Sequence, residues 1–216
     1  MVYHGTCGRS FFNFGYRPIK PEYFTMDTTA ARNKIKAQRN ALSLDDAAAA
    51  SIDISRRLWN LPVLSRARRI ACYFPVGREV DCQFFVSAAW ERGRTMLLPV
   101  LNGAELLFSN YNSSTVFSRN QHNIPEPVVK KSQLVRPQEI DVVLTPLVAF
   151  DAMGNRIGMG GGYYDRSFRF MRNRMAWHHP TLIGLAYDFQ KVPDIKACSW
   201  DIPLQFVVTE KSIYRF

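Results

Sequence analysis

Apolar and polar residues alternate along the chain in blocks, and the apolar blocks predict the strands of a sheet. Runs of four to ten residues that are apolar almost throughout are typical of strands buried on both faces. We expect strands at residues 69–74, 95–99, 105–111, 141–150, 181–186 and 206–209, the last being the final strand of the chain. The dipeptide Asn102-Gly103 favours a hairpin between the second and the third of them.

Helical patterns precede and separate these runs. Thr28–Asn40 predicts a basic helix, whose charged side is either a binding surface or simply a solvated face. Ser43 and Asp46 have the spacing of a capping box that opens a second helix. We expect this helix to run to about Trp59 and Pro62 to stop it. Two more helices are expected at residues 83–92 and 167–172. Strands separated by helices, with one hairpin, predict an α/β fold with a mixed or mostly parallel sheet and helices on both faces.

Two segments show no regular period. Residues 1–26 mix Gly, Phe, Tyr and Pro and lack the apolar core and cleavage site of a secretory signal. We predict that they form a dispensable leader, with the true start at Met26, ahead of a single domain over residues 27–216. Residues 112–137 are polar and contain Ile124-Pro-Glu-Pro127, so we expect a long loop of the kind that often carries function.

Composition narrows the class of protein. The 216 residues are 47% hydrophobic and 21% charged, which suits one well-cored domain, and no apolar run approaches the roughly 18 residues that span a bilayer. The four cysteines form no C-x-x-C pair, so neither a zinc site nor a disulfide framework is predicted. The net charge of +10 favours anionic ligands. Nucleic acid, nucleotides and a polyanionic cofactor all fit this charge. The sequence contains no long block of basic residues, so a nucleic-acid-binding tail is not predicted. Our expectations are a cytoplasmic location, a monomer, and no nucleic-acid or membrane partner.

The most specific chemistry lies in a glycine-rich stretch near residue 160. Gly158, Gly160, Gly161 and Gly162 fall within five residues, between a predicted strand and a predicted helix. Glycine lets successive backbone N–H groups turn inward, so this arrangement can surround a phosphate group. Arg156 and Arg166 could add charge-assisted contacts, and Asp165 could hold a Mg²⁺ ion that joins phosphate oxygens. The alternative is a tight, solvent-facing loop without a ligand.

The order of residues excludes two common nucleotide-binding motifs. A Walker A loop ends in Gly-Lys-Ser/Thr, whereas this stretch ends in Gly162-Tyr163. A dinucleotide fingerprint needs glycine at its sixth place, and counting from Gly158 the sixth place is Tyr163. His178 and His179 follow each other in the chain, and this pair does not predict a metal site. Adjacent side chains point apart on most backbones, and no third ligand is apparent.

In these motifs the chain resembles the 5-formyltetrahydrofolate cyclo-ligase (5,10-methenyltetrahydrofolate synthetase) family. The glycine stretch from Asn155 to Asp165, with Thr145-Pro-Leu-Val-Ala-Phe-Asp151 before it, looks like the family's signature. The other landmarks follow the family's order and are Ala41-Leu-Ser43, Tyr73-Phe74 with Glu79, Ile124-Pro-Glu-Pro127, Gly184-Leu-Ala-Tyr-Asp188 and Trp200-Asp-Ile-Pro-Leu204. The resemblance covers roughly residues 28–210 and is more specific than the glycine stretch alone.

The resemblance implies a fold and a reaction. The fold would be a three-layer α/β sandwich in the class of the phosphosugar isomerase and CoA-transferase folds. The reaction would convert 5-formyltetrahydrofolate to 5,10-methenyltetrahydrofolate with ATP and Mg²⁺, through a phosphorylated formyl group. Phosphoryl transfer needs positioning and charge neutralisation more than a protein nucleophile, and neither a Ser-His-Asp nor a Cys-His set is evident in the chain.

The resemblance also implies roles for particular residues. The ATP-binding positions would be Arg32, Arg156, Ile157, Gly158, Met159, Gly160, Gly161, Gly162, Tyr163 and Tyr164, with Arg156 and Tyr163 as catalytic candidates. The folate-binding positions would be Phe74, Glu79, Met159, Gly160, Gly161, Gly162 and Tyr163, and the metal-binding positions Asp165 and Asp201. Taken alone, Phe74 could equally be a core aromatic residue, and Asp201 could be a turn residue ahead of Pro203.

The chain departs from the family pattern at two positions. Many members carry Lys or Arg where this chain has Thr28, and Arg32, Lys34 or Lys36 would have to compensate. Gln205 stands where an acid is frequent, which argues against a metal ligand there. Two other functions fit the basic composition. One is a related α/β enzyme acting on a sugar phosphate or CoA ester. The other is a non-enzymatic binder of nucleic acid or folate, for which a steep salt dependence with nucleic acid is expected.

Overall fold

The computed structural model describes residues 28–172 and 179–216. The predicted leader and His178 lie outside them. The α-helices are α1 (Thr28–Asn40), α2 (Leu44–Leu58), α3 (Pro62–Arg66), α4 (Gln83–Glu91) and α5 (Tyr163–Ser167). The strands are β1 (Arg69–Ala71), β2 (Thr95–Asn102), β3 (Glu105–Tyr111), β4 (Phe117–Arg119), β5 (Pro125–Pro127), β6 (Val142–Pro146), β7 (Ala149–Phe150), β8 (Arg156–Ile157), β9 (Thr181–Leu185), β10 (Phe206–Val208) and β11 (Ile213–Arg215). Short 3₁₀ turns are η1 (Lys131–Gln133), η2 (Pro137–Glu139), η3 (Arg169–Arg172) and η4 (Asp188–Gln190).

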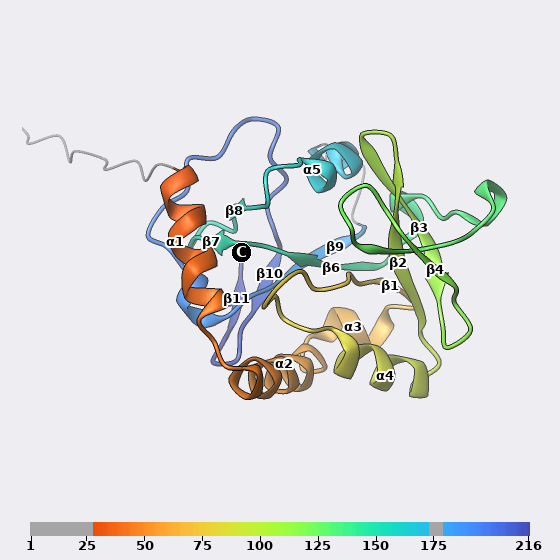
Figure 1. The fold of residues 1–216 in the computed structure, drawn as a ribbon, viewed down its shortest axis with the longest axis horizontal. Helices are drawn as coiled ribbons and strands as arrows, with labels where there is room; N and C mark the ends of the chain where they lie inside the picture. Colours follow the sequence, from red (N-terminus) through yellow and green to blue (C-terminus); the bar gives the residue numbers. More distant parts are fainter. Residues whose placement is uncertain (1–27, 173–178) are drawn as a thin grey trace, which may run out of the picture.

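One seven-stranded sheet forms the centre of the molecule (Figure 1). Its strand order is β11-β10-β9-β6-β1-β2-β3. The five inner strands are parallel, while β3 and β11 pair antiparallel with their neighbours at the two edges. The sheet is therefore mixed and mostly parallel, as predicted. The two smaller sheets are the hairpins β4-β5 and β7-β8.

Alternate residues of the inner strands contribute side chains to two hydrophobic cores, one on each face of the sheet. Ile70 and Leu144 face the core that holds Leu58 and Phe85, from α2 and α4. Their chain neighbours, Ala71 and Val143, face the opposite core together with Phe168, which follows α5. In Figure 1, α2, α3 and α4 accordingly lie on one side of the strands and α5 on the other. Burial of both strand faces explains why these runs are apolar throughout.

The chain reverses its progression through the sheet between β1 and β6. After β1 it continues outward to β2 and β3, whereas after β6 it continues through β9 and β10 in the other direction. At such a switch point the segments that follow two neighbouring parallel strands diverge, and ligands of open α/β sheets bind in the crevice between them. The segments that follow β1 and β6 are the ones that carry the predicted folate and ATP residues.

Several local predictions are confirmed. The helix Thr28–Asn40 has the predicted bounds, and Ser43 caps α2 by accepting a hydrogen bond from the Asp46 N–H at 3.0 Å. Asn102 pairs with Glu105 across the turn of the predicted hairpin.

Other predictions are wrong in detail. Residues 141–150 form two strands, because β7 leaves the main sheet to pair with β8. Residues 112–137 contain the hairpin β4-β5 instead of an unbroken loop, and β11 follows the strand predicted to be last. The helix expected at 167–172 begins at Tyr163 and gives way to a 3₁₀ turn. The helix α2 ends at Leu58, close to the predicted end near Trp59, but Pro62 begins α3 as well, since its fixed φ suits the first position of a helix.

Candidate active site

The glycine loop, Gly158–Gly162, runs from β8 directly into α5. Gly160 and Gly162 have φ values of +103° and +64°, which residues with a side chain rarely adopt. Gly162 is also the residue that caps α5, and the loop is largely exposed. The strand–loop–helix order predicted from the sequence is therefore present, although the strand is the short β8 and the helix begins four residues early.

Two arginines from other parts of the chain hold the loop. Arg32 of α1 donates from Nε to the Gly158 carbonyl oxygen at 3.0 Å. Arg166 donates from Nη2 to the Gly161 carbonyl oxygen at 2.6 Å, and from Nε to the Ala104 carbonyl oxygen at 2.7 Å. Each guanidinium neutralises part of the carbonyl dipoles and leaves the loop N–H groups to other partners. Arg32, predicted to bind ATP, thus lies against the loop that was predicted to do the same.

Arg156 joins the loop to the segment that contains Asp201. Its Nη2 forms an ion pair with the Asp165 carboxylate at 2.7 Å, and its Nη1 donates to the Ile202 carbonyl oxygen. The Ile202 N–H donates to the same Asp165 oxygen at 3.1 Å. The Arg156 side chain is 6% exposed and the Asp165 side chain 26%. The structure therefore brings Arg156 and Asp165 together and joins both to the backbone of Ile202, which follows Asp201 in the chain.

Asp201 and Asp165 are the acids that the sequence associates with a metal ion. The Asp201 Oδ2 accepts a hydrogen bond from the Cys198 N–H at 2.8 Å, which is the turn role considered for it. Among the residues described, no group of three or more His, Cys, Asp or Glu side chains gathers in one place. Mg²⁺ commonly takes only one or two carboxylates and completes its shell with water and substrate phosphates. One or two carboxylates are enough for that mode of binding, and they are too few for a cation site made of protein ligands alone.

The buried carboxylate of Asp151, which was not predicted as a site residue, shapes the turn that precedes Arg156. Asp151 is 1% exposed. It accepts hydrogen bonds from the backbone N–H groups of Met153, Asn155 and Ile195 at 2.9, 3.0 and 3.1 Å, and from the Asn155 side chain at 2.9 Å. These bonds close the turn between β7 and β8, which fixes the start of β8 and hence the place of Arg156. The sequence feature that could have indicated this role is the dipeptide Phe150-Asp151 at the end of a predicted buried strand.

Glu79 lies on the segment after β1, at the other side of the switch point. Its carboxylate pairs with Arg39 of α1, Nη1 to Oε1, at 3.3 Å, and accepts the Val76 N–H at 3.0 Å through Oε2. Burial raises the pKa of Glu79, and the Val76 N–H and the Arg39 guanidinium oppose that rise. Arg39 was not predicted as a site residue, and its partner is 40 positions away, so no local pattern could have indicated it.

Phe74 belongs to an aromatic cluster at the same end of the sheet. Its ring centroid lies 6.0 Å from that of Tyr111 and 5.2 Å from that of Phe117, the latter pair meeting edge to face. The Phe74 side chain is half-buried, so it is packed on one side and accessible on another. This position is compatible with both interpretations offered from the sequence, a core aromatic residue and an apolar wall for a ligand ring.

The two tyrosines after the glycine loop have different surroundings. The Tyr163 hydroxyl lies 3.1 Å from Gln121 Nε2 and 2.9 Å from His122 Nε2, at the tip of the β4-β5 hairpin. Tyr164 points inward, where burial raises its pKa and the nearby Glu79 carboxylate raises it further. The start of α5 therefore lies between the hairpin tip and the Glu79 segment. Gln121 and His122 join the site, although no pattern in the sequence pointed to them.

The motif Ile124-Pro-Glu-Pro127 holds the hairpin in this place. The Glu126 carboxylate accepts hydrogen bonds from the Leu101 N–H of β2 at 3.0 Å and from the Asn120 side chain at 3.2 Å. Asn120 in turn accepts the His122 N–H at 2.9 Å. The role of this motif is thus to connect the hairpin tip to the main sheet.

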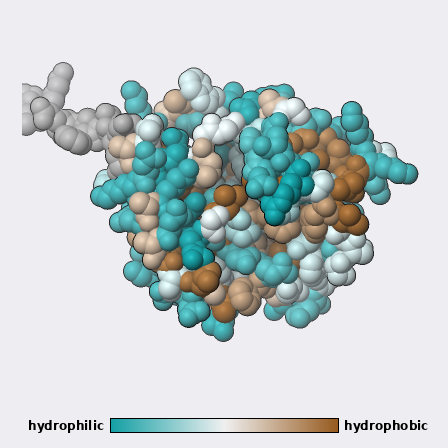
Figure 2. All heavy atoms as spheres, in the orientation of Figure 1, coloured by the Kyte–Doolittle hydropathy of each residue, from teal (hydrophilic) through white to brown (hydrophobic). Residues whose placement is uncertain are grey.

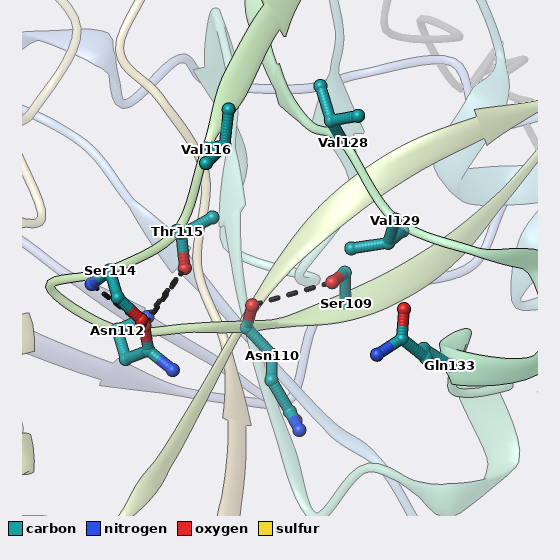
Figure 3. A pocket seen from close by; sticks show the side chains of 9 residues that line it. All are labelled: Ser109, Asn110, Asn112, Ser114, Thr115, Val116, Val128, Val129 and Gln133. Carbon is teal, nitrogen blue, oxygen red and sulfur yellow. Dashed lines mark hydrogen bonds between the residues drawn. The ribbon is translucent and has the colours of Figure 1, made fainter.

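The surface around the site is polar, and two cavities lie away from the predicted site residues. Hydrophilic residues cover α1 and surround α5 in Figure 2, and an apolar patch lies over the end of the molecule that contains β2, β3 and β4. A cavity of about 310 Å³ at that end is lined by Ser109, Asn110, Asn112, Ser114, Thr115, Val116, Val128, Val129 and Gln133 (Figure 3). A cavity of about 230 Å³ lies between α1 and residues 189–193. None of the predicted site residues lines either cavity.

Comparison with known proteins gives one consistent result. The model of the 5-formyltetrahydrofolate cyclo-ligase family matches residues 25–210. The 5-formyltetrahydrofolate cyclo-ligase of Escherichia coli (strain K12) is 32% identical over 187 residues, covering 84% of this chain and 100% of that protein. The protein of the same name from Haemophilus influenzae is 34% identical over 174 residues, covering 79% and 89%. The solved structure of Aquifex aeolicus 5,10-methenyltetrahydrofolate synthetase superposes with a TM-score of 0.73 at 29% identity, covering 87% and 92%.

Proposed function

The chain belongs to the 5-formyltetrahydrofolate cyclo-ligase family, and from this membership we propose that it closes the ring of 5-formyltetrahydrofolate to give 5,10-methenyltetrahydrofolate. The reaction consumes ATP in the presence of Mg²⁺ and releases ADP and phosphate. The observation that carries the proposal is the brace formed by Arg156, Asp165 and Ile202, which lies beside the glycine loop and across the switch point from Glu79.

The chemistry requires activation of a poor leaving group. The formyl oxygen on N5 attacks the γ-phosphorus of ATP, and ADP leaves. The N10 nitrogen then attacks the formyl carbon, the N10 proton is lost, and the oxygen departs as part of inorganic phosphate. No protein nucleophile is needed, so the chain has to align two substrates and neutralise the charge of the transferred group.

The ATP side of the site is the region around the glycine loop. We assign triphosphate binding to the run from Arg156 to Tyr164 and to Arg32, because a guanidinium and exposed glycine amides are the donors that phosphate oxygens accept. Arg156 supplies a charge that is largely shielded from water, where electrostatic stabilisation of a transition state is strongest. Tyr163 lies at the mouth of the loop, with its hydroxyl near His122, and can orient a substrate oxygen.

The folate side of the site is the segment after β1 together with the glycine loop from Met159 to Tyr163. Phe74 offers the face of a half-buried ring to the pteridine. The Glu79 carboxylate accepts hydrogen bonds from pteridine N–H groups, since a carboxylate has about four acceptor positions and two are used by Arg39 and Val76.

We assign Mg²⁺ binding to Asp165 and Asp201. When bound there, the ion would neutralise phosphate charge and orient the triphosphate. Asp165 already forms an ion pair with Arg156, so this one residue would contact both the Mg²⁺ ion and the arginine that neutralise the phosphate group.

Among residues 28–172 and 179–216, no helix is long and apolar enough to cross a bilayer. We further propose that the protein acts in the cytoplasm as a monomer. The net charge of +10 suits both substrates, because ATP is a polyanion and folates carry glutamate carboxylates.

An absorbance assay tests the proposal directly. Purified protein is mixed with 5-formyltetrahydrofolate and MgATP in mildly acidic to neutral buffer, and the methenyl product is followed in the near ultraviolet while ADP is quantified. Controls omit ATP, or omit Mg²⁺ in the presence of a chelator. One mole of product per mole of ADP, lost in both controls, supports the proposal. Folded protein that binds ATP but forms no product refutes it and favours a sugar-phosphate or CoA-ester substrate instead.

A further inference from the structure

Arg39, near the end of α1, is the counter-charge of the proposed folate-binding carboxylate. Its Nη1 lies 3.3 Å from Glu79 Oε1, and each of the two side chains is 4% exposed. The pair joins α1 to the segment after β1, so it connects two elements that border the site. Both charges have been removed from water, which is costly for each of them.

Stability alone does not account for this pair. A buried ion pair adds little net stability over apolar side chains of the same size, because the cost of removing both charges from water offsets their attraction. The Arg39 Nε atom is buried and has no hydrogen-bond partner among the described residues, and the same is true of the Tyr187 hydroxyl. Arg39 is thus a buried cation that is incompletely satisfied and whose hydrogen bond goes to Glu79. A role in function explains such an arrangement better than packing does.

The electrostatic consequence for Glu79 can be stated with its sign. Burial raises the pKa of Glu79 and favours its protonated form. The Val76 N–H, the Arg39 guanidinium and, more weakly, Lys36 lower that pKa and favour the carboxylate. Loss of the Arg39 charge therefore moves the pKa of Glu79 upward, toward the pH at which the enzyme would work. An opposite charge at this range typically shifts a carboxyl pKa by about 1–3 units.

We infer that Arg39 is a positioning residue for the folate substrate: it keeps Glu79 ionised and fixes the direction of its carboxylate, so that Glu79 can accept hydrogen bonds from the pteridine N–H groups. Arg39 and Glu79 are equally buried, with 4% of each side chain exposed, so the contact with the folate is assigned to Glu79 from the proposed function, and Arg39 acts through its hydrogen bond to Glu79. The inference rests on the proposed function and adds to it the residue that sets the state of Glu79.

Other titratable groups near Glu79 do not replace Arg39. Lys36 lies on the same helix, whereas Tyr73 and Cys82 come from the segment around Glu79 and Tyr164 from α5. Burial raises the pKa values of both tyrosines and of the cysteine, the last to about 12, so all three are neutral at physiological pH. Of Glu79, Tyr73, Cys82 and Tyr164, Glu79 is therefore the one whose charge changes below neutral pH.

The test compares two substitutions that keep a hydrogen-bond donor but differ in charge. Arg39→Lys keeps the cation, and Arg39→Gln removes it. Arg56→Gln is the matched control, because Arg56 lies on α2 with 76% of its side chain exposed. For each protein, kcat and KM for both substrates are measured at several pH values, and binding of 5-formyltetrahydrofolate is measured by calorimetry at low and high pH. Thermal unfolding shows which variants are folded.

We expect Arg39→Gln to raise the KM for 5-formyltetrahydrofolate while the KM for ATP stays unchanged. In a plot of kcat/KM for the folate against pH, the fall on the acid side should begin about one pH unit higher in this variant. At pH values below this acid limb, the variant should bind folate about tenfold more weakly than the unsubstituted protein does. Arg39→Lys should recover most of the loss, and Arg56→Gln should match the unsubstituted protein.

Four outcomes would overturn the inference. An unchanged acid limb in folded Arg39→Gln shows that the Arg39 charge does not govern Glu79. An equal rise in both KM values shows a general structural role. If Arg39→Gln does not fold, an Arg39→Lys variant with a shifted acid limb has the same meaning, because the charge was retained. An inactive unsubstituted protein refutes the proposed function, and this inference with it, whereas an active one with normal Arg39 variants refutes the inference alone.

Discussion

Replacing Asp151 tests whether one buried carboxylate builds the turn that places Arg156. Asp151→Ala removes the acceptor of four hydrogen bonds, three of them from backbone N–H groups. The carboxylate is 1% exposed, so water cannot easily reach the donors that it leaves behind. A buried donor without a partner costs about 1–3 kcal/mol. Because the four donors share one site, their costs do not add fully, and we expect a total loss of about 3–5 kcal/mol.

The size of this loss makes it easy to measure. Domains of this size are typically stable by about 5–15 kcal/mol, so Asp151→Ala should remove a large fraction of the free energy of unfolding. Equilibrium unfolding in urea, followed by two independent probes, gives that free energy if the transition is two-state. Asp53→Ala is the control, since Asp53 is an exposed carboxylate on α2 with 51% of its side chain accessible. It should change stability by no more than about 0.5 kcal/mol.

Asp151→Asn separates the shape of this side chain from its hydrogen bonding. The amide keeps one acceptor oxygen but presents N–H groups to the donors that met the other oxygen, so we expect it to be destabilising as well. Folded Asp151→Ala should also lose turnover, because β8 would no longer hold Arg156 in place. A loss of stability below about 1 kcal/mol in Asp151→Ala would refute this account of the turn.

Three more predictions concern residues of the site. Arg156→Ala should lower kcat by about 10²–10³-fold, because it removes a preorganised charge, and should cost only about 1–3 kcal/mol of stability. Steady-state kinetics and urea unfolding measure the two effects, and an unchanged kcat would remove Arg156 from the mechanism. His122→Ala should raise KM severalfold and leave the urea midpoint almost unchanged, since His122 is an exposed residue whose ring contacts Tyr163; identical kinetics would mean that the hairpin tip does not order the site. Gly162→Ala should cost about 1–2 kcal/mol, because a φ of +64° strains any residue with a Cβ atom, and an unaffected melting curve would contradict the loop geometry.

The sequence predicted those parts of the fold whose signals are local. All inner strands were found, because burial on both faces makes them apolar throughout. The bounds of α1 and the cap of α2 followed from periodicity and from Ser43. The start of α5 was missed because three glycines precede it and oppose a helix assignment. The strand β5 was missed because Pro125 and Pro127 argue against a strand, although prolines are tolerated at a sheet edge.

The candidate site was predictable only as a set of residues, and its connections were not. The pairing of Arg156 with Asp165 spans 9 positions and lies within one motif. The contacts of α1 with Gly158 and Glu79 span 126 and 40 positions and have no local signature. Such contacts depend on how the elements pack, and a single sequence contains no direct record of packing.

The helix α1 is the element that these long-range contacts share. Arg32 and Arg39 are seven residues apart, about two turns of helix, so they lie on the same face and about 10 Å apart along its axis. The first holds the glycine loop through Gly158, and the second holds the segment after β1 through Glu79. Ile35 and Ala31, both buried, attach the same helix to the body of the protein. The basic side of α1 is therefore more than a solvated face, since two of its arginines connect the proposed ATP side and the proposed folate side through one rigid element.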